Sequence, residues 1–130
     1  MANFYTNNGV VFDDQSAAST LTGAWINVGR GHTVGFHTYS ASGTRAGTIT
    51  VQGSGKPTPS STEAVTLAFQ NYSTGTVVTS LTVSNGVAHS ALLGLPFYEF
   101  PWVRLIYTAG SGTGNLSCWF WQKHFGNSQP

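Results

Sequence analysis

Hydrophobic and polar residues alternate along most of this chain, which is the pattern of strands that bury one face. The clearest case lies late in the sequence, where Val103, Leu105 and Tyr107 alternate with Trp102 and Arg104. No segment shows the 3.6-residue period of an amphipathic helix. We therefore predict an all-β chain.

Turn signals rich in glycine, proline, serine and asparagine separate the predicted strands. The Asn-Gly pair at 85–86 indicates a tight hairpin, and two prolines mark a loop at 53–62. The predicted strands cover residues 24–28, 33–40, 47–52, 64–72, 76–83, 87–93, 100–108 and 115–123. About eight short strands with regular turns predict a two-sheet antiparallel β-sandwich, most simply a jelly roll, with an up-and-down barrel as the alternative.

The length of 130 residues fits one domain. We expect a single β-sandwich over 23–130, preceded by residues 1–22 as an N-terminal arm or a first strand. This leader carries Phe4, Tyr5 and Phe12, which are candidate contacts with a partner. The N-terminus has neither a basic region nor an apolar run, so we expect no signal peptide. We also expect no membrane span, because no stretch approaches the roughly 20 apolar residues that one requires.

Charged residues are scarce, which restricts the classes of partner. Asp, Glu, Lys and Arg make up 7% of the chain, against about 25% in ordinary soluble domains. Five basic residues and a net charge of +1 cannot form the stripe that phosphate backbones need, so we expect no nucleic-acid partner. A nearly neutral surface offers little repulsion between copies, which suits a protein in an assembly. The alternative is a small extracellular β-domain with a Ser/Thr-rich face.

Catalytic, cofactor and metal signatures are weak throughout the sequence. The run Gly53-Ser54-Gly55-Lys56 resembles the end of a phosphate-binding loop, but Pro57 follows and no helix is expected there. The carboxylates are too few and too scattered for a glycosidase pair, and no two histidines have strand spacing for a shared metal. We predict no enzyme, no cofactor and no metal site. Cys118, the single cysteine, is expected in the core.

Aromatic residues supply the positive evidence for binding. Trp119, Phe120 and Trp121 are consecutive in the last predicted strand. If Phe120 faces the core, both tryptophans lie on the opposite face and form an apolar patch that monomers usually avoid. Trp102 would extend this patch if its strand pairs alongside. Three interpretations stay open: a protein contact anchored by tryptophan, a platform that stacks on sugar rings, or rings covered by the chain's own leader.

Arg104 belongs to the candidate partner contacts as well, because a guanidinium inside an apolar strand requires partners or a place at a rim or interface. The segments 47–54, 102–107 and 110–114 together form a strand ending in a Gly-Ser turn, an Arg-bearing strand and a Gly-rich hairpin. This pattern resembles small virion proteins of tailed bacteriophages, most closely the jelly-roll decoration, or cement, proteins of capsids. The resemblance covers the C-terminal two-thirds of the chain as a loose pattern.

The resemblance implies a symmetric homo-oligomer on the capsid exterior that clamps neighbouring major capsid subunits after synthesis in the host cytoplasm. Its expected partners are the major capsid protein and copies of itself. The alternative is a carbohydrate- or receptor-binding module, such as a tail-fibre tip, with a glycan as partner. The two hypotheses differ in whether the exposed aromatic rings meet protein or sugar.

Overall fold

The chain is all-β in a computed structural model that describes residues 4–28, 33–40, 47–71, 73–83, 89–94, 100–111 and 114–125. No helix occurs in these ranges, and every strand pairing between them is antiparallel. The predicted all-β class and the antiparallel pairing are confirmed. The Asn-Gly hairpin predicted at 85–86 lies outside the described residues.

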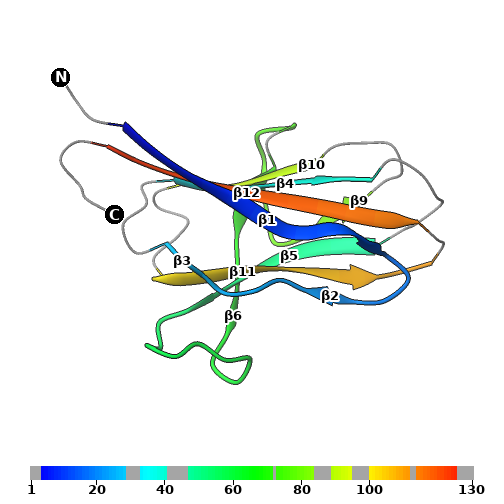
Figure 1. Cartoon of the computed structure of the whole chain (residues 1–130), viewed down its shortest axis with the longest axis horizontal. Coiled ribbons are helices and arrows are strands. Elements are labelled where there is room, and N and C mark those ends of the chain that lie inside the picture. The colour runs from blue at the N-terminus through cyan, green and yellow to red at the C-terminus, as the bar shows by residue number, and fades with distance from the viewer. Residues whose placement is uncertain are drawn as a thin grey trace.

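Two sheets share one core (Figure 1). Sheet 1 has the order β1 (Phe4–Ser16), β12 (Asn115–Phe125), β4 (Thr33–Tyr39), β10 (His89–Gly94), β7 (Phe69–Asn71) and β8 (Val77–Val78). Sheet 2 has the order β2 (Leu21–Thr22), β11 (Trp102–Ala109), β5 (Gly47–Ser54) and β6 (Val65–Leu67), with β3 (Ile26–Asn27) also beside β11 and β9 (Leu81–Val83) beside β5.

Two chain segments pass from one sheet to the other. A single residue, Ala68, separates β6 in sheet 2 from β7 in sheet 1, and two residues separate β8 in sheet 1 from β9 in sheet 2. The strands β6 and β7 together therefore cover about the length of the strand predicted at 64–72, and β8 and β9 together that of the strand predicted at 76–83. These breaks account for part of the difference between twelve observed strands and about eight expected ones.

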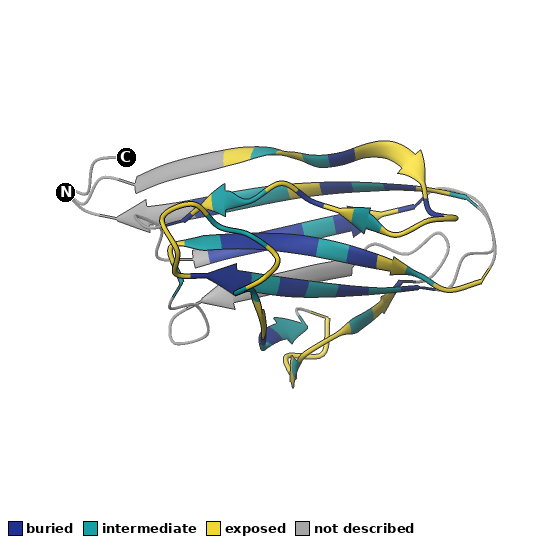
Figure 2. Cartoon of the chain, turned by 90° about the horizontal axis from the view of Figure 1, so that it is seen from below, coloured by how far each residue is buried: buried dark blue, intermediate teal, exposed yellow. Residues whose placement is uncertain are grey.

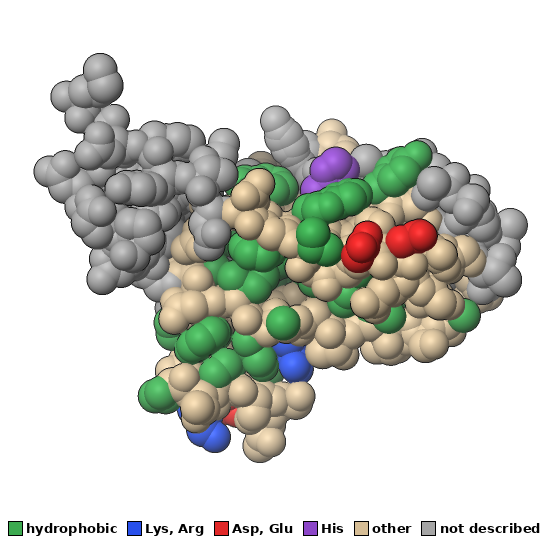
Figure 3. All heavy atoms as spheres, in the orientation of Figure 1, with side chains coloured by type: hydrophobic (Ala, Val, Ile, Leu, Met, Phe, Trp, Pro, Cys, Tyr) green, Lys and Arg blue, Asp and Glu red, His purple; other side chains and the backbone are tan. Residues whose placement is uncertain are grey.

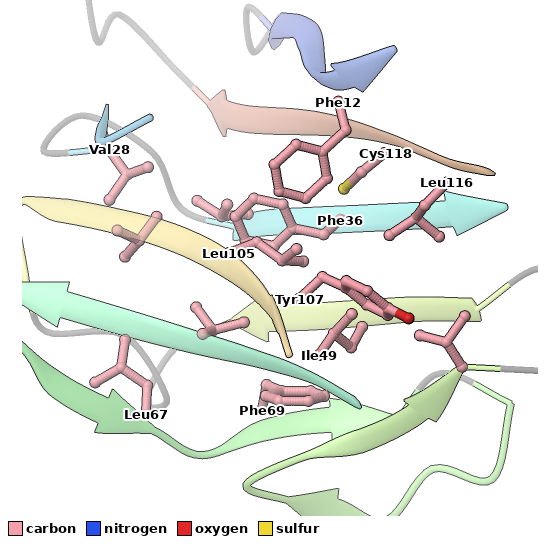
Figure 4. Close-up of a cluster of buried hydrophobic side chains, with 14 of the residues drawn as sticks. Phe12, Val28, Phe36, Ile49, Leu67, Phe69, Leu105, Tyr107, Leu116 and Cys118 are labelled. Carbon is pink, nitrogen blue, oxygen red and sulfur yellow. The ribbon is translucent and has the colours of Figure 1, made fainter. Parts of the chain in front are cut away.

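The core lies between the two sheets (Figure 4). In β11 the predicted alternation holds: Val103, Leu105 and Tyr107 are fully buried. The hydroxyl of Tyr107 donates a hydrogen bond of 3.1 Å to the carbonyl of Ala17, so its polar end is satisfied inside an apolar environment. Figure 2 shows buried positions alternating with more exposed ones along the described strands, as the period of two requires.

The last strand follows the same rule. Leu116 and Cys118 are fully buried, and Phe120 is partly buried against the core. Trp119 and Trp121 occupy the alternate positions, where Trp119 is exposed and Trp121 is half-buried. Burial raises the pKa of the Cys118 thiol, because a thiolate is poorly solvated in an apolar core.

The leader forms the edge strand of sheet 1, and its register corrects one expectation. Val10 pairs with Trp119, but the next paired residue is Phe12, which faces Cys118, so Val11 forms a bulge. The bulge shifts the alternation by one residue and turns Phe12 into the core, where it is 3% exposed. Phe12 therefore does not lie on a surface that a partner could contact. The side chains of Phe4 and Tyr5 lie outside the described residues.

Candidate docking faces

The outer face of sheet 1 carries a row of aromatic and aliphatic side chains, of which Val10, Tyr39 and Trp119 are exposed. We call it the apolar ladder: Val10, Trp119, His37, Tyr39 and Trp121. The register places Val10, Trp119 and His37 directly beside one another across β1, β12 and β4. Val10 is 57% exposed, and Trp119 and Tyr39 are each 39% exposed. An exposed tryptophan in a row with other large apolar side chains is typical of an interaction surface.

Contacts within the ladder hold its rings in place. The ring of His37 meets the indole of Trp119 edge-on, with 5.6 Å between ring centroids. Trp121 lies over Gly35, its cross-strand partner on β4, and a side chain at Gly35 would overlap the indole. Trp121 is therefore half-buried against the backbone of the sheet, whereas Trp119 is free to contact a partner.

An open cavity continues the apolar surface beyond Val10. Its volume is about 290 Å³, and it lies between the edge strands β1 and β3. It is lined by Val10, Val11, Ala24, Trp25, Ile26 and Phe120. The lining is almost entirely apolar, so the cavity suits a hydrophobic side chain more than a charged group.

The free edge of β1 is protected against further strand pairing. A second register shift lies between Phe12 and Gln15, and Asp14 in this stretch has a positive φ of 49°. The backbone N–H of Asp14 donates to the hydroxyl of Ser117 at 3.0 Å, and both Asp13 and Asp14 are exposed. Bulges and charges are common devices against edge-to-edge aggregation. Figure 3 shows acidic side chains beside the hydrophobic ones on this part of the surface.

A second group of side chains lies on the outer face of sheet 2. We call it the Arg104 cluster: Arg104, Trp25, Gln52, Ser61 and Trp102. The Nε of Arg104 donates to Oε1 of Gln52 at 2.9 Å, and Nη2 donates to the hydroxyl of Ser61 at 3.0 Å. The indole of Trp25 covers the guanidinium, with 4.4 Å from the ring centroid to Cζ. Arg104 is 8% exposed as a result.

The loop above this cluster is anchored by Glu63. Its carboxylate accepts hydrogen bonds from the Ser60 N–H at 2.7 Å, from the Ser54 hydroxyl at 2.8 Å and from the Ser60 hydroxyl. The Ser60 hydroxyl is the main reason that the pKa of Glu63 falls from 4.5 to about 2, since these donors stabilise the ionised form. Glu63 thus serves the loop.

The structure separates the predicted site residues into two groups on opposite faces. Trp119 and Trp121 lie together on sheet 1, but Trp102 and Arg104 lie on sheet 2, because β11 pairs with β5, β2 and β3. The condition for Trp102 to extend the Trp119 patch, that its strand pairs beside β12, is therefore not met. Sequence reasoning gave no binding role to Trp25, Gln52 or His37, whose roles depend on neighbours far away in the chain.

Two further features bear on the chemistry of these faces. Among the described residues, no three His, Cys, Asp or Glu side chains are grouped as ligands of a metal ion would be. The described part of the chain also contains no helix of the length and apolarity needed to cross a membrane.

Two solved structures of other proteins resemble this chain over most of its length. No protein-family model and no curated protein matches the sequence. The SPBc2 prophage-derived protein YomS has a similar structure, with a TM-score of 0.67 and 13% identity over 94% of this chain and 96% of YomS. The PBSX exported protein XepA is similar with a TM-score of 0.68 and 14% identity over 93% of this chain. The match covers 38% of XepA, so this chain spans little more than a third of that protein.

Proposed function

We propose that this chain is a non-enzymatic structural protein of a bacteriophage particle, most concretely a capsid decoration protein that docks through the apolar ladder. Its partners would be the major capsid protein and further copies of itself, on the capsid exterior. The observation that carries this proposal is the exposed row of Val10, Trp119 and Tyr39 on the outer face of sheet 1.

The strand pairing supports a jelly roll as the finer description of the fold. If β2 with β3, and β6 with β9, are each taken as one strand position, the pairs are nested. The first long strand pairs with the last (β1 with β12), the second with the second-last (β2 and β3 with β11), and so on inwards to β4 with β10 and β5 with β6 and β9. This is the arrangement of one long hairpin wrapped into two sheets.

The structural neighbours favour a phage context. YomS is prophage-derived by name, and XepA is an exported protein of PBSX. Their identities to this chain of 13% and 14% are low, so their support for the proposal comes through shared architecture. The scarcity of charge adds a second argument, because 7% charged residues leaves little electrostatic repulsion between adjacent copies.

The energetics of the ladder fit a weak contact repeated many times. Several hundred Å² of apolar contact, at roughly 25 cal/mol per Å², gives several kcal/mol before association costs. A single contact of this size holds loosely, but many copies linked on one shell gain avidity. The cavity beside Val10 would accept an apolar side chain of the neighbour and add a specific anchor.

The experiment measures occupancy on purified particles of the phage or prophage that encodes this chain. We expect Trp119→Ala to reduce occupancy by about tenfold or more, because a central tryptophan anchor typically contributes 2 kcal/mol or more. Trp102→Ala on the opposite face is the matched control and should leave occupancy unchanged. Wild-type occupancy of the Trp119 variant, with an unchanged melting temperature for both variants, would rule out docking through the ladder.

A second candidate function is a carbohydrate- or receptor-binding module, such as a tail-fibre tip. The observation in its favour is the Arg104 cluster, where two indoles and several hydrogen-bonding groups share one sheet face. The two functions use opposite faces of the molecule. Particle docking should therefore be weakened by Trp119→Ala, and glycan or receptor binding by Trp102→Ala.

A further inference from the structure

Arg104 is a buried cation that has no acidic partner among the described residues. Its side chain is 8% exposed, and its hydrogen bonds go to a neutral amide and a neutral hydroxyl. Glu63, the acid in the neighbouring loop, has its carboxylate bound by Ser54 and Ser60. Removing a guanidinium from water without a counter-charge is costly, so buried arginines are normally paired.

Among the described residues, the hydrogen bonds of Arg104 leave some of its N–H donors without an acceptor. A guanidinium has five N–H donors, of which Nε–H and one Nη2–H are engaged. The two bonds and the stacked indole of Trp25 fix the plane of the group. A fixed guanidinium with remaining donors is preorganised for a carboxylate, which it can bind with two parallel hydrogen bonds.

The surroundings of Arg104 indicate what kind of molecule carries that carboxylate. Trp102 lies two residues away on the same face of β11 and is half-buried. Hydroxyl and amide groups lie beside the guanidinium, from Ser61 in the loop and from Gln52 on β5. Flat aromatic surfaces match the C–H faces of sugar rings, and hydroxyl and amide groups match their hydroxyls. Figure 3 shows basic and hydrophobic side chains together on the lower part of the visible surface.

We propose that the Arg104 cluster is a binding site for a carboxylated sugar, such as a uronic acid within a glycan. The carboxylate binds the free N–H groups of Arg104, and the adjoining rings stack on the exposed surface of Trp102. This site goes beyond a role in particle assembly, because it lies on the sheet opposite to the apolar ladder.

Charge decides against the other anionic polymers. The whole sequence has five basic residues and a net charge of +1, and Arg104 and Lys56 are those whose side chains the structure describes. Sulfated glycans and nucleic acids carry dense charge and are bound by several basic residues together. One guanidinium matches a polymer with one weakly charged group per sugar, as in a polyuronate.

The experiment compares a short oligogalacturonate with its methyl ester by titration calorimetry on the intact chain. Esterification removes the charge and keeps the sugar rings, so we expect at least about tenfold weaker binding of the ester, as loss of a charge-assisted hydrogen bond implies. Arg104→Met should abolish this preference, and Trp102→Ala should weaken both ligands together. Trp119→Ala is the matched control on the other face and should bind as the wild type does.

A glycan array widens the test to other carboxylated sugars, including sialylated ones. Binding to acidic glycans with loss in the Arg104 variant supports the site. If the folded wild-type protein binds no carboxylated glycan on the array, or binds ester and acid equally, the proposal is overturned. Either result leaves the particle-binding test of the ladder unaffected, because that test depends on Trp119.

Discussion

Glu63 shows how one side chain organises a loop in a protein with almost no charge. Three donors from Ser54 and Ser60 converge on its carboxylate and lower its pKa from 4.5 to about 2. The loop that carries Ser61 is thereby placed over Arg104. A residue that looks isolated in the sequence is thus part of the support of the Arg104 cluster.

This pKa shift predicts a pH dependence of stability. Because the folded-state pKa is depressed, the contribution of Glu63 is present above about pH 4.5 and is lost as the pH falls towards 2. We expect Glu63→Gln to lower stability at neutral pH and to approach the wild type near pH 2. Urea unfolding across this pH range measures it. An equal difference between the two proteins at pH 2 and pH 7 would contradict the assigned role.

Arg104 and Trp119 mark the two kinds of chemistry available at the surface. Arg104 is buried among neutral partners on sheet 2, and Trp119 is an exposed indole on sheet 1. The first suits an anionic ligand, and the second suits an apolar contact. A substitution on one face serves as the control for a substitution on the other, so single substitutions can separate the two roles.

At the scale of elements, the register of β1 sets which of its side chains are exposed and which are buried. The bulge at Val11 leaves Val10 on the outer face and turns Phe12 into the core. The second irregularity, at Asp13 and Asp14, interrupts the free edge of the sheet. The face of the strand is therefore exposed at Val10, whereas its edge is irregular and poorly suited to pairing with a further strand.

This assignment predicts that alanine substitutions at two nearby positions of β1 lower the free energy of unfolding by different amounts. Phe12→Ala should destabilise the fold by about 3–5 kcal/mol, as loss of a buried phenyl ring does. Val10→Ala, at a position 57% exposed, should change stability by less than about 0.5 kcal/mol. Urea unfolding measures both. If the Val10 variant proved the less stable of the two, the bulge would be misplaced.

The sequence predicts the strands better than the partners of those strands. Alternation in the segments around Tyr107 and Cys118 correctly identified their buried faces, since a period of two follows from the strand backbone itself. The bulge at Val11 was not predicted, because one extra residue leaves no mark in composition. The sheet to which Trp102 belongs could not be predicted either, because no local pattern in the sequence indicates whether its strand pairs with β12 or with β5.

At the scale of the whole molecule, the two sheets present different surfaces. The outer face of sheet 1 is apolar around Trp119, and the outer face of sheet 2 combines indoles with hydroxyls and one guanidinium. The two proposals accordingly assign particle docking to the outer face of sheet 1 and ligand binding to the outer face of sheet 2.

Cryo-electron microscopy of the particle with this chain bound tests the central claim most directly. Docking through the apolar ladder predicts that Val10, Trp119 and Tyr39 are buried against a neighbouring subunit, and that Arg104 and Trp102 face solvent. A reconstruction in which the outer face of sheet 1 points into solvent, while another surface makes the contact, would contradict it.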